Sequence, residues 1–184
     1  MKLLIVGGYG TFGGRIVQLL ENEPRLTIMV AGRSLGKAAA WCGHRGSVAA
    51  RLMPAVFDRD GDPAAQLASL RPDTLVDASG PFQAYGEGCY RLVEACIEQG
   101  VNYFDLADGS DFVAGMPAFD AVARRAGLFV LSGAHRCGGA PALIRHGAGR
   151  QDQGRHRAVA LCRRRRKRHP RHRGLRRTAG HAAA

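Results

Sequence analysis

Three glycines at fixed spacing near the start of the chain constrain its fold more than any other feature. Gly8, Gly10 and Gly13 follow the apolar run at residues 3–6 and match the pattern GxGxxG. In that pattern the first glycine permits a tight turn, the second lets the backbone approach a pyrophosphate, and the third lets a helix pack closely on a strand. Apolar residues then recur at helical spacing over residues 12–20. This context favours a dinucleotide-binding turn over a purely structural one.

The sequence up to residue 134 continues as an alternation of strands and helices. Predicted strands cover residues 26–30, 52–58, 74–78, 102–106 and 128–132, and predicted helices cover residues 37–41, 63–70, 87–99 and 117–126. Short strands that alternate with helices predict an α/β fold with a Rossmann-type, doubly wound parallel sheet. Ligands of such sheets bind at the carboxyl ends of the strands.

The residues that follow the second predicted strand select between NAD and NADP. An acidic residue there would bind a ribose 2′-hydroxyl, whereas a basic residue would accommodate a 2′-phosphate. Arg33 offers a planar fork of donors and Ser34 adds a hydroxyl, so we predict NADP. The alternative is that Arg33 only caps a solvated loop. Asp58 lies at the end of the third predicted strand, near where an adenine would lie, and could equally be a turn residue.

Several segments resemble the NADP-binding domain of the saccharopine dehydrogenase-like family. GGYGTFG with AGRS, then SGPFQAYG at residues 79–86 and EACIEQGVNYFDLADG at residues 94–109, occur in the order and spacing of that family. The resemblance covers residues 1–134 and extends weakly to 141–143. It implies an oxidoreductase that transfers a hydride with NADP(H), and a substrate domain after the sixth strand. Because the sequence after residue 134 does not read as such a domain, we expect a fragment limited to cofactor binding.

The resemblance also implies a set of cofactor-binding residues. Gly8, Gly10, Thr11, Phe12, Arg33 and Ser34 would bind the adenosine and pyrophosphate half, and Ser79, Gly80 and Pro81 would line the nicotinamide side. With Gly13 and Asp58, these residues form the predicted cofactor site. No catalytic acid can be named: Tyr103, Asp105 and Asp108, near the end of the fifth strand, suit turn and N-cap roles as well. His44 has no evident orienting partner for acid–base work.

The sequence changes character after residue 134. Residues 1–134 hold 12 Lys and Arg against 14 Asp and Glu, a net charge of −2, whereas residues 135–184 hold 15 against the single acid Asp152, a net charge of +14. The second segment contains no Phe, Tyr, Trp, Met, Ser, Asn or Glu. Such a composition cannot bury enough apolar surface to offset its chain entropy. We therefore expect a domain at residues 1–134 and a disordered basic tail at residues 135–184.

Three explanations of this tail are open. A dense basic run could bind nucleic acid through counterion release, although it lacks the interleaved aromatic residues that stack on bases. Its cysteines and histidines could bind a metal, but their spacing matches no zinc finger, and we expect no metal site. The explanation we favour is an out-of-frame translation of a GC-rich gene joined near Ala134. The alternative to an oxidoreductase function is a non-catalytic one: the chain could be an NADP-sensing module, or a nucleic-acid binder that acts through the tail.

Nothing in the sequence suggests export or a membrane partner. Only four apolar residues lie between Lys2 and the glycines, and no apolar run approaches the roughly 18 residues that would span a bilayer. The five cysteines form no CxxC pair, so we interpret them as buried or incidental thiols. We expect a soluble, cytoplasmic protein.

The out-of-frame explanation makes a prediction about the gene. Another reading frame downstream of codon 134 should encode a patterned α/β continuation, because a frame shift destroys hydrophobic periodicity while the original frame keeps it. Sequencing the DNA around codon 134 is the measurement. A downstream region in which no frame encodes such a pattern would contradict the explanation.

Overall fold

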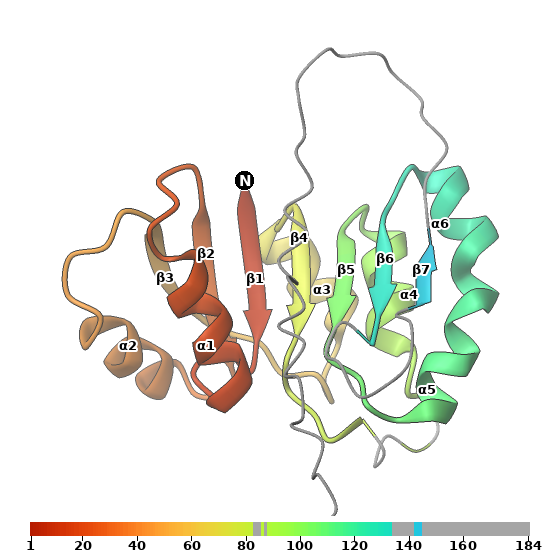
Figure 1. Ribbon diagram of the computed structural model, residues 1–184, viewed down its shortest axis with the longest axis horizontal. Coiled ribbons are helices and arrows are strands. Elements are labelled where there is room, and N and C mark those ends of the chain that lie inside the picture. The colour runs from red at the N-terminus through yellow and green to blue at the C-terminus, as the bar shows by residue number, and fades with distance from the viewer. Residues whose placement is uncertain (83–85, 87, 134–141, 145–184) are drawn as a thin grey trace, which may run out of the picture. The chain divides into compact units, whose positions relative to one another are not determined.

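The chain folds around a seven-stranded sheet (Figure 1). The structure is a computed structural model that describes residues 1–82, 86, 88–133 and 142–144. The strands of the sheet stand in the order β3-β2-β1-β4-β5-β6-β7. They are β1 (Lys2–Val6), β2 (Thr27–Gly32), β3 (Arg51–Val56), β4 (Thr74–Asp77), β5 (Asn102–Asp105), β6 (Val130–Ser132) and β7 (Ala142–Ile144). The first six are parallel, and β7 is antiparallel to β6. The predicted α/β Rossmann-type fold is confirmed.

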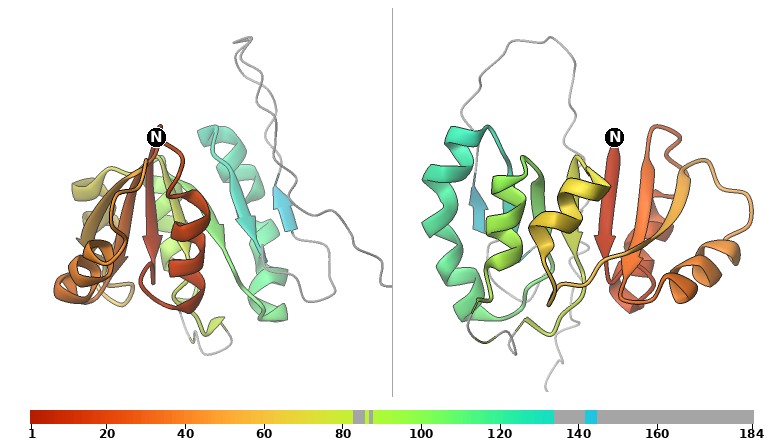
Figure 2. Two further views of the ribbon diagram at one scale, coloured as in Figure 1. Left: turned by 60° about the vertical axis from the view of Figure 1, so that its left-hand side comes forward. Right: turned by 180° about the vertical axis from the view of Figure 1, so that it is seen from behind.

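Helices cover both faces of this sheet. They are α1 (Thr11–Leu20), α2 (Leu35–Gly43), α3 (Pro63–Leu70), α4 (Arg91–Glu98), α5 (Ser110–Gly115), the 3-10 helix η2 (Met116–Phe119) and α6 (Asp120–Ala126). Figures 1 and 2 show α1 and α2 on one face, with α3 and α4 on the other. This arrangement follows from the strand order, because right-handed crossovers that run in opposite directions from the centre place their helices on opposite faces.

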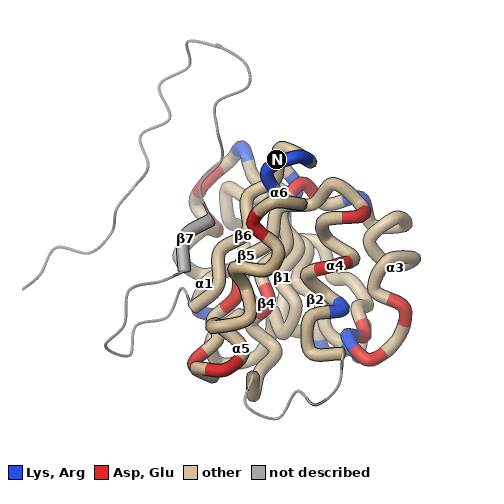
Figure 3. The backbone as a smooth tube through the Cα atoms, turned by 90° about the vertical axis from the view of Figure 1, so that its right-hand side faces the viewer, with Lys and Arg blue, Asp and Glu red and all other residues tan. Residues whose placement is uncertain are grey.

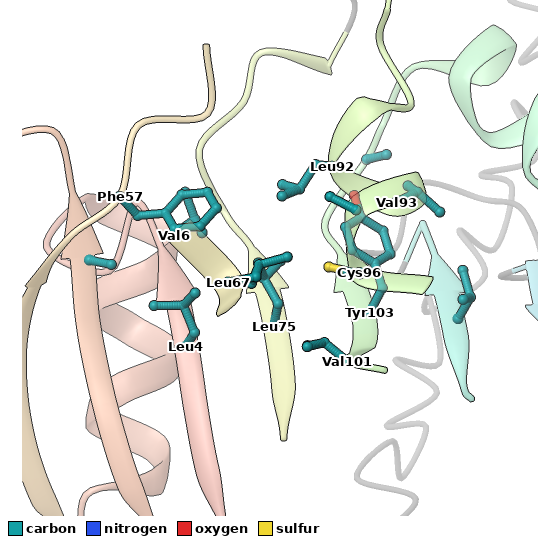
Figure 4. Close-up of a cluster of buried hydrophobic side chains, with 14 of the residues drawn as sticks. Leu4, Val6, Phe57, Leu67, Leu75, Leu92, Val93, Cys96, Val101 and Tyr103 are labelled. Atoms are coloured by element: carbon teal, nitrogen blue, oxygen red, sulfur yellow. The ribbon is translucent and has the colours of Figure 1, made fainter. Parts of the chain in front are cut away.

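The two faces bury alternate side chains of the same strands. On β1, Leu3 and Ile5 pack in one cluster with Val17 of α1, whereas Leu4 packs in the other cluster with Leu67 of α3. Successive side chains of a strand point to opposite faces, so a strand that is covered on both sides reads as a continuous apolar run. Figure 4 shows members of the cluster that contains Leu4 and Leu67; they come from β1, α3, β4, α4 and β5.

The strand order reverses direction between β1 and β4. β1 pairs with β2 on one side and with β4 on the other, although β2 and β3 lie between them in the sequence. The connections that leave the carboxyl ends of β1 and β4 therefore diverge to opposite faces. A crevice at this position is where open α/β sheets bind their ligands.

Two elements differ from the sequence-based expectation. Helix α5 was not predicted, because its six residues, which follow Gly109 and end at Gly115, are too few to show a helical period. The strand Ala142–Ile144 lies within residues 135–184, where the sequence predicted a disordered tail, and it pairs with β6. This pairing satisfies backbone groups of β6 that would otherwise form a sheet edge. The other residues of 135–184 lie outside the described part, so their predicted disorder stays a prediction.

Charges of both signs are spread over the described residues (Figure 3). This agrees with the near balance of charge in residues 1–134. Within the described ranges, no helix has the length and apolar character needed to cross a bilayer.

Candidate cofactor-binding site

The loop between β1 and α1 is closed by backbone hydrogen bonds. The Gly10 N–H donates to the Gly7 carbonyl oxygen (2.9 Å), and the Gly8 N–H donates to the carbonyl oxygen of Ala31 on β2 (2.9 Å). Gly7 has a φ of +75°, a backbone conformation that residues other than glycine rarely adopt. The tight turn thus depends on Gly7 as well as Gly8, and the sequence analysis did not single out Gly7.

The same loop leaves no room for a side chain at Gly8 or Gly13. A Cβ atom on Gly13 would lie 2.2 Å from the Gly7 carbonyl oxygen, and one on Gly8 would lie 2.8 Å from the carbonyl oxygen of Ile5. A Cβ atom on Gly10 would lie 3.1 Å from the Gly7 carbonyl oxygen, which is tight but less severe. The three glycines of the pattern therefore hold the start of α1 against the end of β1.

The first turn of α1 has backbone donors that receive no side-chain cap from the described residues. Its N-cap is Gly10, in an extended conformation, which provides no side-chain acceptor for the first N–H groups of the helix. Such N–H groups, together with the positive end of the helix dipole, attract an anion. The start of α1 is therefore suited to a pyrophosphate.

A cavity of about 500 Å³ opens beside this loop, at the carboxyl ends of four strands. It is lined by Val6, Gly7, Tyr9, Gly10, Gly32, Arg33, Phe57, Asp58, Arg59, Asp60, Ala78, Ser79, Gly80 and Pro81. Six of the predicted cofactor-binding residues are in this set: Gly10, Arg33, Asp58, Ser79, Gly80 and Pro81. The structure thus brings together predicted residues that come from four separate loops.

A second cavity, of about 360 Å³, adjoins the first through residues 78–81. Phe12 lines it, together with Phe82 and Leu106, and Asp108 is its one ionisable lining residue among those described. Asp108 is exposed, whereas the other two candidate acids at this strand end are buried. A mainly apolar cavity with one carboxylate lies beside the predicted nicotinamide wall.

The remaining predicted residues line neither cavity. Gly8 and Gly13 act through the backbone contacts described above, and Thr11 is the first residue of α1. The Ser34 hydroxyl accepts a hydrogen bond from the Lys37 N–H (3.3 Å) and caps α2. This capping role differs from the phosphate contact predicted for Ser34.

Two predicted alternatives for Asp58 are both compatible with its surroundings. It lines the cavity, and its carboxylate also accepts a hydrogen bond from the Asp60 N–H (3.1 Å), as in an Asx turn. The side chain of Gln66 on α3 holds the Asp58 backbone through bonds to both its N–H and its carbonyl oxygen. The loop after β3 is therefore braced against α3.

Tyr9 and Arg59 are site residues that the sequence analysis missed. The Tyr9 hydroxyl accepts a hydrogen bond from the Ser34 N–H (3.3 Å), and a Cβ atom on Gly32 would lie 2.5 Å from that hydroxyl. Tyr9 thus connects the glycine loop to the turn after β2. Its position between two glycines of the pattern was the only signal available from the sequence.

Arg59 forms an ion pair with Asp77, the last residue of β4. The Arg59 Nε lies 3.2 Å from the Asp77 Oδ2, and the Asp77 side chain is fully buried. Burial raises the pKa of the Asp77 carboxyl above its ordinary value, while the Arg59 charge and hydrogen bonds from Ser79 oppose that shift. The pair lies at the wall of the first cavity, since Arg59 and Ser79 line it.

Tyr103 and Asp105 have no access to either cavity. Both are fully buried, and the Asp105 Oδ1 accepts hydrogen bonds from the Ala107 N–H, the Ser132 hydroxyl and the Gly133 N–H, each at 2.9 Å. Burial raises the pKa of Asp105, and these bonds oppose the shift. Asp105 therefore joins the loops after β5 and β6.

The other candidate groups belong to the scaffold. A ring nitrogen of His44 contacts the Ala40 carbonyl oxygen at the end of α2. Cys96 is buried, which raises the pKa of its thiol, while Cys42 and Cys89 are half-buried, and all three are free. Among the described residues, no group of three or more His, Cys, Asp or Glu could hold a metal ion. Cys137 and Cys162 lie outside the described part.

These features fit a dinucleotide. The glycine loop lets a ligand approach the backbone, the start of α1 offers free donors, and the first cavity has a volume within the range of about 300–1,000 Å³ that is usual for ligand sites. The fold and the crevice together define a nucleotide-binding Rossmann domain.

A comparison of the sequence with known protein families identifies the family of this chain. The family described as Saccharopine dehydrogenase NADP binding domain matches residues 3–131, and the chain belongs to it. The resemblance found in the motifs is thereby confirmed, and the cofactor is a nicotinamide dinucleotide.

Comparison with known proteins gave no match among curated proteins, whereas several solved structures are similar. GenD2 from gentamicin A biosynthesis, in complex with NAD, is 18% identical with a TM-score of 0.49, and the match covers 72% of this chain and 34% of GenD2. A putative short-chain dehydrogenase/reductase from Corynebacterium glutamicum is 19% identical with a TM-score of 0.48, over 72% of this chain and 82% of that one. AtPrR2 with NADP+ and (+)pinoresinol is 19% identical with a TM-score of 0.45, over 71% and 48%. The chain thus spans about a third of the length of GenD2.

The contact between Gly13 and Gly7 leads to a prediction. Gly13→Ala should abolish measurable NADPH binding, because the new Cβ atom would displace the glycine loop from the start of α1. Gly36→Ala is the matched control, since a Cβ atom there meets nothing within 4 Å. Fluorescence titration measures binding, and circular dichroism checks that both variants are folded. Wild-type affinity in a folded Gly13→Ala variant would contradict the assignment of the loop.

Proposed function

We propose that this chain is the cofactor-binding domain of an oxidoreductase and that it prefers NADP to NAD. The observation that carries this proposal is the position of Arg33. It lines the first cavity directly after β2, where a 2′-phosphate would lie, and it is exposed. It takes part in no ion pair among the described residues, so its guanidinium is available to a phosphate.

The lining residues suggest how the cofactor would lie. The adenosine half would occupy the cavity between Arg33 and Asp58, and the pyrophosphate would lie at Gly10 and the start of α1. The nicotinamide half would reach residues 79–81, which are shared by both cavities. This order agrees with the general placement of dinucleotides across the crevice of such sheets.

The cofactor, when bound, supplies or accepts the hydride, so the task of the protein is to bind and orient it. Phe12, Phe82 and Leu106 would shield the second cavity from water beside the nicotinamide wall. Asp108 would bring the one ionisable group there among the described residues. The described domain would thus bind the cofactor and form only part of the site for the hydride acceptor. That acceptor would be a small molecule.

Removing the Arg33 side chain should reduce the preference for NADP. Loss of a hydrogen bond to a charged group costs about 1.5–3 kcal/mol, so Arg33→Ala should weaken NADPH binding by roughly 10- to 100-fold. NADH binding should stay within about twofold, because NADH lacks the phosphate. Fluorescence titration with both cofactors gives the two dissociation constants.

The control for this prediction is Arg51→Ala. Arg51 is also exposed, but it is the first residue of β3, whereas the cavity lies beyond the carboxyl end of that strand. This variant should leave both dissociation constants unchanged. Equal loss of NADPH and NADH affinity in Arg33→Ala, or no loss of either, would contradict a role for Arg33 in choosing the cofactor.

A further inference from the structure

Asp77 is an ionisable residue at a place in the sheet where an apolar one would be expected. It ends β4, it is fully buried, and its neighbours in register are Val6 on β1 and Asp105 on β5. A buried carboxylate is costly unless it is paired, and well-packed apolar residues often replace buried ion pairs without loss of stability. Stability alone therefore does not account for a charge at this position.

The two oxygens of the Asp77 carboxylate bind different loops. Oδ1 accepts hydrogen bonds from the N–H (3.0 Å) and the hydroxyl of Ser79, in the loop after β4. Oδ2 pairs with the Nε of Arg59, in the loop after β3, at 3.2 Å. Arg59 extends the connection, because its Nη2 donates to the Cys89 carbonyl oxygen (3.3 Å).

Arg59 and Ser79 both line the first cavity, whereas Asp77 does not. One buried carboxylate thus connects two walls of the cavity from beneath. The hydrogen bonds to Oδ1 and the ion pair at Oδ2 hold one residue of each wall against the same short carboxylate, so this connection restrains the distance between the wall after β3 and the wall after β4.

We propose that Asp77 is a positioning residue that sets the width of the cofactor cavity by holding Arg59 and Ser79 on opposite oxygens of one carboxylate. The inference rests on the proposed function, since it assumes that this cavity receives the dinucleotide. Asp77 does not touch the cofactor; it acts through the two residues that it holds.

Asp105 provides a natural comparison. It is the register neighbour of Asp77, it is equally buried, and its Oδ1 also holds backbone and hydroxyl donors after the strand end. Its partners, however, are Ala107, Ser132 and Gly133, and none of them lines either cavity. Asp77→Asn and Asp105→Asn therefore make the same chemical change in the same row of the sheet, one beneath the wall of the first cavity and one beneath the loop after β5, which does not line that cavity.

The test measures NADPH and NADH dissociation constants of the two variants at a temperature well below their unfolding transitions. Both substitutions should lower the unfolding temperature. Only Asp77→Asn should weaken cofactor binding, by about tenfold or more, and by the same factor for NADPH and NADH, because the walls serve both cofactors. This parallel loss differs from the selective loss expected for Arg33→Ala.

Two results would overturn the inference: an affinity within twofold of wild type in Asp77→Asn, or an equal loss in Asp105→Asn. If Asp77→Asn does not fold, the double variant Arg59→Met with Asp77→Leu replaces the ion pair by an apolar pair. It should recover folding without recovering affinity, and recovery of both would overturn the inference. If the wild-type chain itself binds neither cofactor, the proposed function fails, which is a separate outcome.

Discussion

The close approach of Gly13 to Gly7 is the constraint on which the rest of the site depends. With a Cβ position only 2.2 Å from the Gly7 carbonyl oxygen, any side chain at residue 13 would push α1 away from the end of β1. The contact places the uncapped start of α1 at the point where the strand order reverses. Free N–H donors and the positive helix end therefore face the crevice between β1 and β4.

Around this fixed point, each strand end contributes one part of the site. The turn after β2 brings Arg33 to the cavity, and the loop after β3 brings Asp58. The loop after β4 brings Ser79, which is held by the buried Asp77. The helices act from behind these loops, since Gln66 on α3 braces the backbone of the loop after β3. The shape of the cavity is thus set by groups that lie beneath it as well as by those that line it.

The sequence predicted the parts of this account that depend on local pattern. The glycine spacing, the six parallel strands and Arg33 could be read in order along the chain, because turns, buried strands and strand ends have local signatures. The pairing of Arg59 with Asp77 could not, since it joins loops that only the sheet order brings together. The short helix α5 has too few residues to show a period, and the strand β7 depends on its tertiary pairing with β6. The capping role of Ser34 is local, since the donor is the Lys37 N–H, but a phosphate contact was predicted for this residue instead.

The central claim is that the crevice at the carboxyl ends of β1 and β4 holds an NADP molecule. A crystal structure of the chain grown with NADP+ tests it most directly. The account predicts the pyrophosphate at Gly10 and the start of α1, the 2′-phosphate within hydrogen-bond distance of Arg33, and the nicotinamide against residues 79–81. A cofactor bound at another place, or the absence of bound cofactor at saturating concentration in solution, would contradict it.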